Sequence, residues 1–361
     1  MSYYTSTLRW IEHRELIHED PNRWAVLGRP VGLPNQETQQ LDHRRYLITG
    51  GAGFIGSHLS EALLDAGHEV TILDNLSTGR WSNVQHLERR PGFRVLIAGA
   101  EDQSLLQREV PDHDVVYHLA SAVGVKLLID KPVETVQTIV RTTDVLLDVC
   151  SRYRRPILLT STSEVYGKSQ ALPFNEDADV VMGATSKRRW AYACAKALDE
   201  FLALAHFYET SLPVFIVRLF NTVGPRQTSQ YGMVLPTFVQ QALRGQPLTV
   251  YGDGAQRRCF CSVHDVVRAI VGLTGSQEAV GQVVNIGSQE EISMVDLARR
   301  VIALTGSTSE ITFVPYEQAY GPGFDDMARR IPDTSRIDGL IGWAPTHDLN
   351  AIIGQLVEHH A

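Results

Sequence analysis

Residues 46–59, "YLITGGAGFIGSHL", place three glycines between a short apolar run and an amphipathic run that continues to Gly67. The first run predicts a buried strand and the second a helix. Gly50, Gly53 and Gly56 permit a tight turn and let a ligand approach the backbone closely. Because the N-terminus of the following helix offers N–H groups and positive potential, the stretch predicts a pyrophosphate site.

Apolar runs of strand length alternate with helical patterns over the next part of the chain. Strands are expected at 46–49, 69–74, 94–99, 114–120, 156–162 and 213–221, and helices at 56–67, 133–153 and 191–209. This alternation predicts an α/β fold, a Rossmann-type doubly wound parallel sheet.

The sequence pattern changes after Asn221. Stretches rich in Gly, Pro and Gln, which predict loops, separate shorter expected helices such as 233–244 and 293–305. We therefore expect an NAD-binding Rossmann domain at 44–222. Residues 223–361 are expected to form mainly a smaller mixed α/β substrate domain, with some segments returning to the first. Residues 1–43 are polar without a sustained period and predict an extension, either a partly ordered tail or an arm that covers a neighbour or a cleft.

Composition limits the class of protein. The formal net charge of −8 over 361 residues argues against a nucleic-acid or membrane-surface protein. The N-terminus lacks an apolar signal core, and no stretch is long and apolar enough to span a membrane. The four cysteines have no zinc-type spacing, so reduced thiols in a cytoplasmic protein and no metal are expected.

Asp74 closes the second expected strand, 18 residues after Gly56. A carboxylate there can accept both hydroxyls of a ribose, whereas a phosphate on that ribose would meet a negative charge. The cofactor is therefore expected to be NAD rather than NADP, although Arg80 acts against this preference.

Tyr192 and Lys196 lie four residues apart in an expected helix and so share one face. An ammonium beside a phenol favours the ionised phenol and lowers its pKa toward a useful range. Such a pair alone is often only a surface contact. Here the glycine loop lies upstream, and the preceding strand ends in "TSTSEVYG" (160–167), where four hydroxyls precede Glu164.

The spacing Gly50-x-x-Gly53-x-x-Gly56 resembles the "TGxxGxxG" form of the extended short-chain dehydrogenase/reductase family. The resemblance implies that Asp102 lies near the adenine and that Ala120 and Ser121 line the path to the nicotinamide. It implies cofactor contacts by Gly50, Gly53, Phe54, Ile55, Gly56, Asp74, Asn75, Asp102, Ala120, Ser121, Tyr192 and Lys196.

The family's catalytic set of Ser/Thr, Tyr and Lys corresponds here to Thr162 or Ser163, Tyr192 and Lys196. The resemblance implies that Tyr192 moves the proton, that Lys196 holds the cofactor ribose and tunes the tyrosine, and that the hydroxyl orients the substrate oxygen. It also implies that helices 133–153 and 191–209 pair across a two-fold axis in a homodimer.

The stretches "RLFNTVGPR", "PLTVYGDGAQRRCF" and "RRIPDTSRIDGLIGWAP" are similar to the nucleotide-sugar branch of this family. The similarity implies that Asn221 contacts the nucleotide sugar, that Arg226 and Arg258 lie near the substrate with Arg258 on the diphosphate, and that Arg330 lies near the sugar. A UDP-sugar is thus the expected substrate.

Within this branch, "STSEVYG" is similar to UDP-glucuronate decarboxylases, and Glu164 is the expected acidic residue of the reaction. The alternatives are a 4-epimerase, then a 4,6-dehydratase, then a dinucleotide-binding protein without catalysis. The chain departs from the decarboxylases at Leu128, where they carry a tyrosine. The family's Asn-x-x-Gly-Thr is here Ile139, Thr142 and Thr143, so the Asn and the Gly are missing.

Overall fold

The computed structural model describes residues 43–121, 131–228, 233–315, 317–318, 327 and 329–360. His43–Ala361 is one compact unit, and Met1–Asp42 is a separate one. The expected extension, apart from His43, and Leu128 lie outside the described residues.

A seven-stranded sheet forms the centre of the unit, and all its neighbouring strands are parallel. Its order is β11-β6-β5-β4-β1-β2-β3. The strands are β1 (Arg45–Thr49), β2 (Glu69–Leu73), β3 (Phe93–Leu96), β4 (Val115–His118), β5 (Ile157–Thr162), β6 (Val214–Leu219) and β11 (Val283–Ile286). The predicted doubly wound parallel sheet is confirmed.

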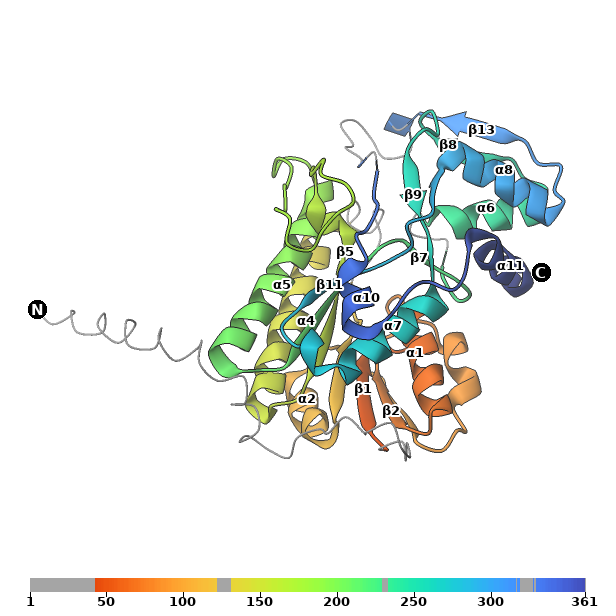
Figure 1. Ribbon diagram of the computed structural model, residues 1–361. Helices are drawn as coiled ribbons and strands as arrows, with labels where there is room; N and C mark the ends of the chain where they lie inside the picture. Colours follow the sequence, from red (N-terminus) through yellow and green to blue (C-terminus); the bar gives the residue numbers. More distant parts are fainter. Residues whose placement is uncertain are drawn as a thin grey trace, which may run out of the picture. The chain divides into compact units, whose positions relative to one another are not determined.

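Helices cover both faces of this sheet because successive strand residues point to opposite sides. In β1, Tyr46 and Ile48 join one buried cluster, while Leu47 joins the other. The first cluster includes residues of α1 (Phe54–Asp65), α7 (Val263–Gly275) and α10 (Ser335–Ile341). The second includes residues of α2 (Gln103–Glu109), α4 (Pro132–Tyr153) and α5 (Arg189–Thr210). Figure 1 shows α4 and α5 on one side of the sheet and α1 and α7 on the other.

A third core lies in the part of the chain after β6. It packs α6 (Val234–Leu243), α8 (Met294–Thr305) and α11 (Leu349–His360) with β8 (Leu248–Tyr251). The remaining strands pair in twos: β7 (Thr222–Val223) with β10 (Cys261–Ser262), β9 (Arg257–Cys259) with β12 (Glu291–Ser293), and β8 with β13 (Ile311–Val314). Short 3-10 turns, η2 (Trp81–Asn83), η3 (Gln85–Leu87), η4 (Val110–Asp112), η5 (Ser163–Tyr166) and η6 (Gln277–Ala279), connect the elements.

Strand β11 pairs with β6 and so returns a late part of the chain to the central sheet. The division into domains at residue 222 stays a prediction. Among the described residues, no helix is long and apolar enough to cross a membrane. All four cysteines are free.

Candidate active site

The strand order places β1 beside β4, and the chain winds outward in opposite directions from this pair. Ligands of open α/β sheets bind at such a point, beyond the carboxyl ends of the strands. The glycine loop follows β1, and Ala120 follows β4. The two segments touch, since a Cβ on Gly50 would lie 2.7 Å from the backbone nitrogen of Ala120.

The glycine loop has the shape that the sequence predicts. Gly50 has φ +72°, a conformation that favours glycine, and a Cβ on Gly56 would overlap the carbonyl oxygen of Gly50. Helix α1 begins at Phe54, and its N-cap, Gly53, provides no side-chain hydrogen bond. The first-turn N–H groups of Phe54, Ile55 and Gly56 therefore suit the phosphates of a dinucleotide.

Asp74 is fixed beside this loop. Its Oδ2 accepts a hydrogen bond from Ala52 N at 3.0 Å, and its Oδ1 accepts one from Leu76 N at 2.8 Å. Burial raises the pKa of its carboxyl, while the two N–H groups oppose that rise. Because a carboxylate oxygen can accept more than one hydrogen bond, both oxygens can still receive ribose hydroxyls.

The other predicted cofactor residues mainly hold their own loops. Asn75 Oδ1 accepts from Ser77 N at 3.0 Å, and Asp102 Oδ1 caps α2 by accepting from Leu105 N at 3.0 Å. Ser121 Oγ is buried and has no hydrogen bond within the described part of the chain. Their roles toward a cofactor stay predictions.

A buried polar chain, which the sequence did not indicate, links β1, β4 and α4. His118 Nδ1 lies 2.7 Å from Thr49 Oγ1, and His118 Nε2 lies 3.2 Å from Thr143 Oγ1. Ala120 N donates to the same Thr49 hydroxyl at 3.3 Å. Burial, and then the positive charge of Lys196, lower the pKa of His118 to about 3, so its imidazole is neutral.

Thr162, rather than Ser163, brings its hydroxyl to Tyr192. Thr162 ends β5 and accepts from Glu164 N at 3.3 Å, which starts the turn η5. The hydroxyl of Thr162 lies close enough to the phenol of Tyr192 to lower its pKa. Ser163 is fully buried. Of the two predicted hydroxyls, Thr162 is therefore the one beside Tyr192, and the catalytic role of either stays a prediction.

The predicted effect of Lys196 on Tyr192 needs correction. Burial, followed by the negative charges of Glu164 and Asp199, raises the pKa of Tyr192. The ammonium of Lys196 instead lies 3.2 Å from Asp199 Oδ2, one turn further along α5. The negative charge of Asp199 offsets the positive charge of Lys196. Lys196 therefore has a weaker electrostatic effect on the phenol of Tyr192. Ionising Tyr192 thus requires further positive charge nearby.

Glu164 lies between two guanidinium groups. Arg189 Nη2 is 3.2 Å from Oε2, and Arg330 Nη1 is 2.8 Å from Oε1. The Glu164 side chain is 13% exposed, and those of Arg189 and Arg330 are 5% and 10% exposed. Sequence reasoning missed Arg189, which is the first residue of α5. The three side chains together carry one excess positive charge close to Tyr192.

Asn221 and Arg258 belong to neighbouring segments. Asn221 Nδ2 donates to Cys259 O at 2.8 Å, which ties the end of β6 to β9. Arg258 is buried, and its Nη1 donates to Arg257 O at 2.8 Å. The amide of Asn221 and the guanidinium of Arg258 thus lie in adjoining segments. Their roles toward a substrate stay predictions.

Arg226 makes a different contact from the one expected. Its Nη2 is 2.7 Å from Glu61 Oε2 on α1. Glu61 lies seven residues beyond Phe54, which is roughly 10 Å along the helix axis from the glycine loop. The contact joins α1 to the segment after β7 and gives no support to a substrate role for Arg226.

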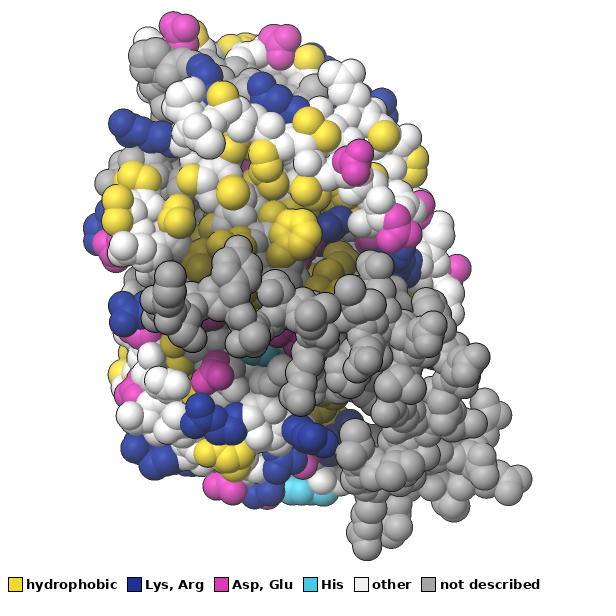
Figure 2. Space-filling model, turned by 90° about the vertical axis from the view of Figure 1, so that its left-hand side faces the viewer, with side chains coloured by type: hydrophobic (Ala, Val, Ile, Leu, Met, Phe, Trp, Pro, Cys, Tyr) yellow, Lys and Arg dark blue, Asp and Glu magenta, His cyan; other side chains and the backbone are white. Residues whose placement is uncertain are grey.

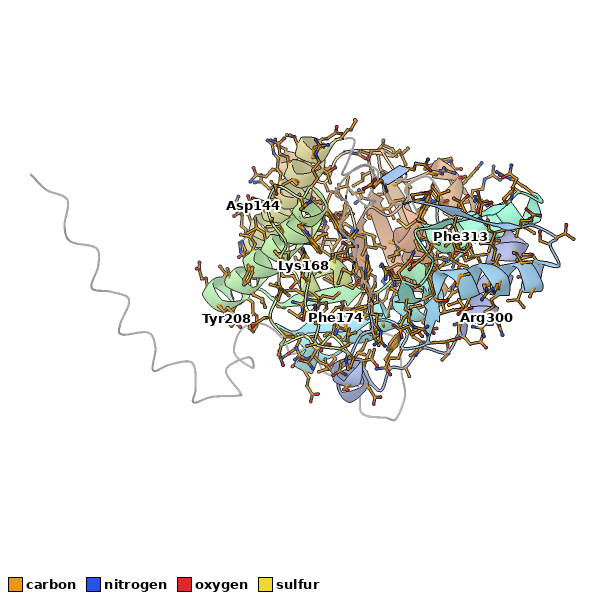
Figure 3. All side chains as sticks on the ribbon, turned by 90° about the horizontal axis from the view of Figure 1, so that it is seen from above. Asp144, Lys168, Phe174, Tyr208, Arg300 and Phe313 are labelled. Atoms are coloured by element: carbon orange, nitrogen blue, oxygen red, sulfur yellow. The ribbon has the colours of Figure 1, made fainter. Side chains whose placement is uncertain are left out.

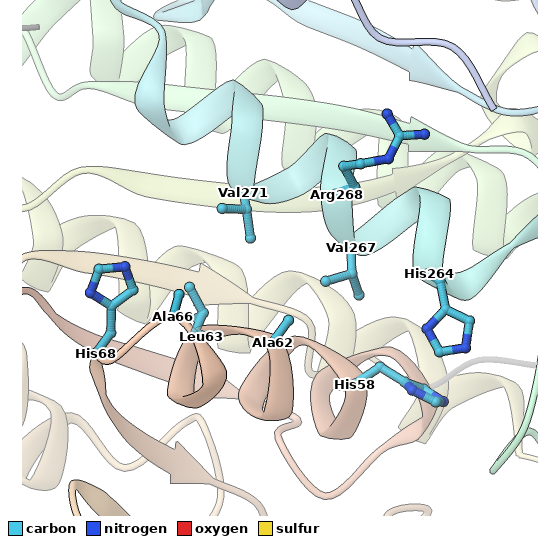
Figure 4. A pocket seen from close by; sticks show the side chains of 9 residues that line it. All are labelled: His58, Ala62, Leu63, Ala66, His68, His264, Val267, Arg268 and Val271. Carbon is cyan, nitrogen blue, oxygen red and sulfur yellow. The ribbon is translucent and has the colours of Figure 1, made fainter. Parts of the chain in front are cut away.

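A cavity of about 290 Å³ lies between α1 and α7. Figure 4 shows its lining residues, His58, Ala62, Leu63, Ala66, His68, His264, Val267, Arg268 and Val271. None of the predicted site residues is among them, so this cavity is separate from the catalytic side chains.

Comparison with known proteins identifies the family. The family described as GDP-mannose 4,6 dehydratase matches residues 47–356, which is most of the chain. The chain belongs to this family. This confirms the predicted nucleotide-sugar branch of the extended short-chain dehydrogenases/reductases, and the protein is an enzyme of that type.

Two relatives are named decarboxylases. UDP-N-acetyl-alpha-D-glucosaminuronate decarboxylase of Bacillus cytotoxicus is 41% identical over 303 residues, covering 84% of this chain and 93% of the relative. UDP-glucuronic acid decarboxylase 1 of Danio rerio is 35% identical over 326 residues, covering 90% of this chain and 75% of the relative. Both are similar to this chain over most of its length.

Among solved structures, UDP-glucuronic acid 4-epimerase from Bacillus cereus, in complex with UDP-glucuronic acid and NAD, is 28% identical to this chain. The TM-score is 0.79, and the match covers 88% of this chain and 98% of the epimerase. Family members with this fold therefore include enzymes with NAD and UDP-sugar bound.

We predict that Tyr192→Phe lowers turnover of a nucleotide sugar by about a hundredfold to ten-thousandfold, because a positioned proton acceptor is lost. Dinucleotide affinity should change less than threefold. Steady-state kinetics and a binding titration check both values. Tyr208→Phe, on the exposed part of α5, is the control and should keep full activity. Near-normal turnover by Tyr192→Phe would exclude it as the proton acceptor.

Proposed function

We propose that the chain is an NAD-dependent decarboxylase of a nucleotide uronate, with UDP-glucuronate as the first-choice substrate. The observation that carries this proposal is the buried group of Glu164, Arg189 and Arg330 next to Tyr192. A neutral hexose does not need two guanidinium groups beside its reacting carbons. A substrate carboxylate does, because guanidinium groups bind carboxylates with strong charge-assisted hydrogen bonds.

NAD fits the residues at the carboxyl end of β1 and β2. The N–H groups of the first turn of α1 would hold its pyrophosphate, and Asp74 would accept the hydroxyls of its adenosine ribose. A buried carboxylate there disfavours an extra phosphate, which supports NAD over NADP. When bound, NAD supplies a hydride acceptor at C4 of the sugar and a positive charge that favours ionised Tyr192.

The first half-reaction depends on Tyr192 and its neighbours. Tyr192 takes the proton of the C4 hydroxyl as the C4–H bond gives up its hydride. Thr162 lies near Tyr192 and would hold the same substrate oxygen. Lys196 would hold the nicotinamide ribose. The product of these steps is a 4-keto sugar.

Carbon dioxide then leaves because the 4-keto uronate is a β-keto acid. The C5–C6 bond breaks, its electron pair moves into an enolate at C4, and C5 later takes a proton. Return of the hydride to C4, with a proton from Tyr192 to the C4 oxygen, would then give a product lighter by carbon dioxide alone. Arg189 and Arg330 would bind the carboxylate before this step. Glu164 shares both cations, so the substrate carboxylate is held less tightly and leaves more easily as a neutral molecule. Glu164 would not simply repel the substrate carboxylate, because the two arginines balance its charge.

Two substrates fit this scheme, UDP-glucuronate and its 2-acetamido counterpart, and the relatives in Danio and Bacillus cytotoxicus are named for one each. A 4-epimerase is the second candidate function, favoured by the likeness to the Bacillus cereus epimerase. It shares the oxidation at C4 but retains the carboxylate.

Mass spectrometry of the products therefore tests the proposal. The purified enzyme with NAD should convert UDP-glucuronate, or the 2-acetamido sugar, into a product lighter by carbon dioxide. UDP-glucose should be untouched. A product of unchanged mass with inverted C4 would reject decarboxylation and support the epimerase.

For Glu164→Gln we predict carbon dioxide release about a hundredfold slower, with substrate binding equal or tighter. The amide keeps the shape but leaves the two guanidinium charges to hold the substrate carboxylate. Oxidation at C4, followed by absorbance at 340 nm, should persist. Glu109→Gln is the matched control, since Glu109 is also 13% exposed and pairs with Arg94 at the end of α2. Equal loss of oxidation and decarboxylation would remove the specific role of Glu164.

We also propose a homodimer formed by the outer faces of α4 and α5. Leu198, Phe201 and Tyr208 lie along one side of α5 and are 44%, 65% and 72% exposed. Figure 2 shows hydrophobic side chains gathered on this face of the molecule. An exposed apolar face of this kind marks an interface with another protein, and a second copy of the chain offers the same face in return.

Phe201→Asp should convert the dimer to a monomer in light scattering at micromolar concentration, because it buries a charge in the interface. Phe313→Asp is the control. Phe313 is 52% exposed on β13, which lies across the molecule from Tyr208 of α5 (Figure 3). A monomeric wild-type protein would contradict the proposal.

A further inference from the structure

A buried ion pair in the site has no role in the scheme so far. Lys196 Nζ lies 3.2 Å from Asp199 Oδ2, and both side chains are only 4% exposed. The two residues are three apart on α5 and so lie on the same side of the helix. Asp199 Oδ1 forms no hydrogen bond of ordinary length within the described residues.

Burying a carboxylate in this way costs free energy. Burial raises the pKa of Asp199, and the charge of Lys196 and the nearby hydroxyl of Thr143 oppose that rise. A buried charge is retained when a partner charge compensates for lost hydration. Burying the Asp199 carboxylate is unfavourable by itself. Its charge stabilises the buried ammonium of Lys196.

Asp199 is the carboxylate that pairs with Lys196, because Glu200 and Glu164 pair with arginines. On the same helix, Glu200 is bound by Arg218 at 2.7 Å and also accepts a hydrogen bond from Ser161. From β4, the neutral His118 faces the ammonium, and from α4 the uncharged Thr143 lies beside Asp199.

On the other side, toward Tyr192, Glu164 is paired with Arg189 and Arg330. These contacts cover the charged and titratable groups that the structure shows around the pair. Glu200 and Glu164 are thus each already bound to arginines.

We propose that Asp199 is a positioning residue that keeps Lys196 charged and fixed against the cofactor ribose. The inference rests on the proposed function for the place of the cofactor, but the pairing itself does not. It also explains how a buried lysine can serve a site whose helix α4 carries Ile139 and Thr142 in place of the Asn and Gly of the family's Asn-x-x-Gly-Thr. Asp199 supplies polar support to the lysine from α5 itself.

The physical reason is that a buried ammonium without a counter-charge gives up its proton readily. With Asp199 present, the ion pair holds the ammonium of Lys196 where it can donate to ribose hydroxyls. With a neutral residue at 199, the buried ammonium loses this compensation and should lose its proton more readily as pH rises. Cofactor binding and proton transfer would then weaken as pH rises.

The test measures NADH affinity of the full chain by fluorescence between pH 6.5 and 9.5. Wild-type affinity should be nearly constant, whereas Asp199→Asn should lose at least tenfold from the low to the high end. Asp199→Glu should restore most of the wild-type behaviour. Parallel curves for wild type and Asp199→Asn would overturn the proposal, because a merely structural role would change affinity equally at every pH.

Turnover provides the second readout. In Asp199→Asn, kcat/KM should fall on the alkaline side, where the wild type reaches a plateau. If Asp199→Asn does not fold, Asp199→Ser, which is smaller and admits water, carries the same two measurements. The binding curves need no turnover, so a wild-type enzyme that binds NADH but releases no carbon dioxide would reject the proposed function alone. Wild-type protein that binds no NADH would reject both.

Discussion

The buried contact of Glu164 with Arg189 and Arg330 is the interaction on which the rest of the site depends. A carboxylate with so little exposure is tolerated only because both guanidinium groups neutralise it. The contact brings together the end of β5, the start of α5 and the segment at 329–332. Each comes from a different part of the chain, so the site forms only when the whole unit is folded.

Packing beneath the contact holds these segments in place. Val165, Tyr166, Phe174, Trp190 and Phe220 form a buried cluster directly next to Glu164 and Arg189 in sequence or space. Phe174 N donates to Ile331 O at 2.8 Å, and Asp333 N donates to Phe174 O at 2.9 Å. The position of Arg330 is thus fixed by backbone hydrogen bonds on the following residues. A rigid pair of cations suits recognition of a carboxylate at one fixed position.

The elements of the fold that follow local patterns could be predicted from the sequence. The period of two in β1, the helical spacing of α4 and α5, and the glycines after β1 each reflect contacts within a short stretch. The sequence predicted that some later segments return to the first domain, but it did not identify β11 as the strand that pairs with β6, because residues 283–286 showed no strand signal that was recognised. Tyr192 and Lys196 were found because their spacing is local.

Ionic partners in the site could not be predicted in the same way. Arg189 and Asp199 look like ordinary charged residues of an amphipathic helix, and only the folded structure shows that both are buried. The choice of Thr162 over Ser163 depends on how β5 turns into η5. Arg226 has its guanidinium on Glu61 because α1 passes close to the segment after β7. The raised pKa of Tyr192 follows from burial and from two carboxylates outside its own sequence motif.

The central claim is that the two arginines and Glu164 form a receptor for a substrate carboxylate. Calorimetric titration of the NAD-loaded Tyr192→Phe enzyme, in which turnover should be strongly reduced, measures this directly. UDP-glucuronate should bind at least tenfold more tightly than UDP-glucose, since the two differ only in the carboxylate. Equal affinity for the two sugars would contradict the account.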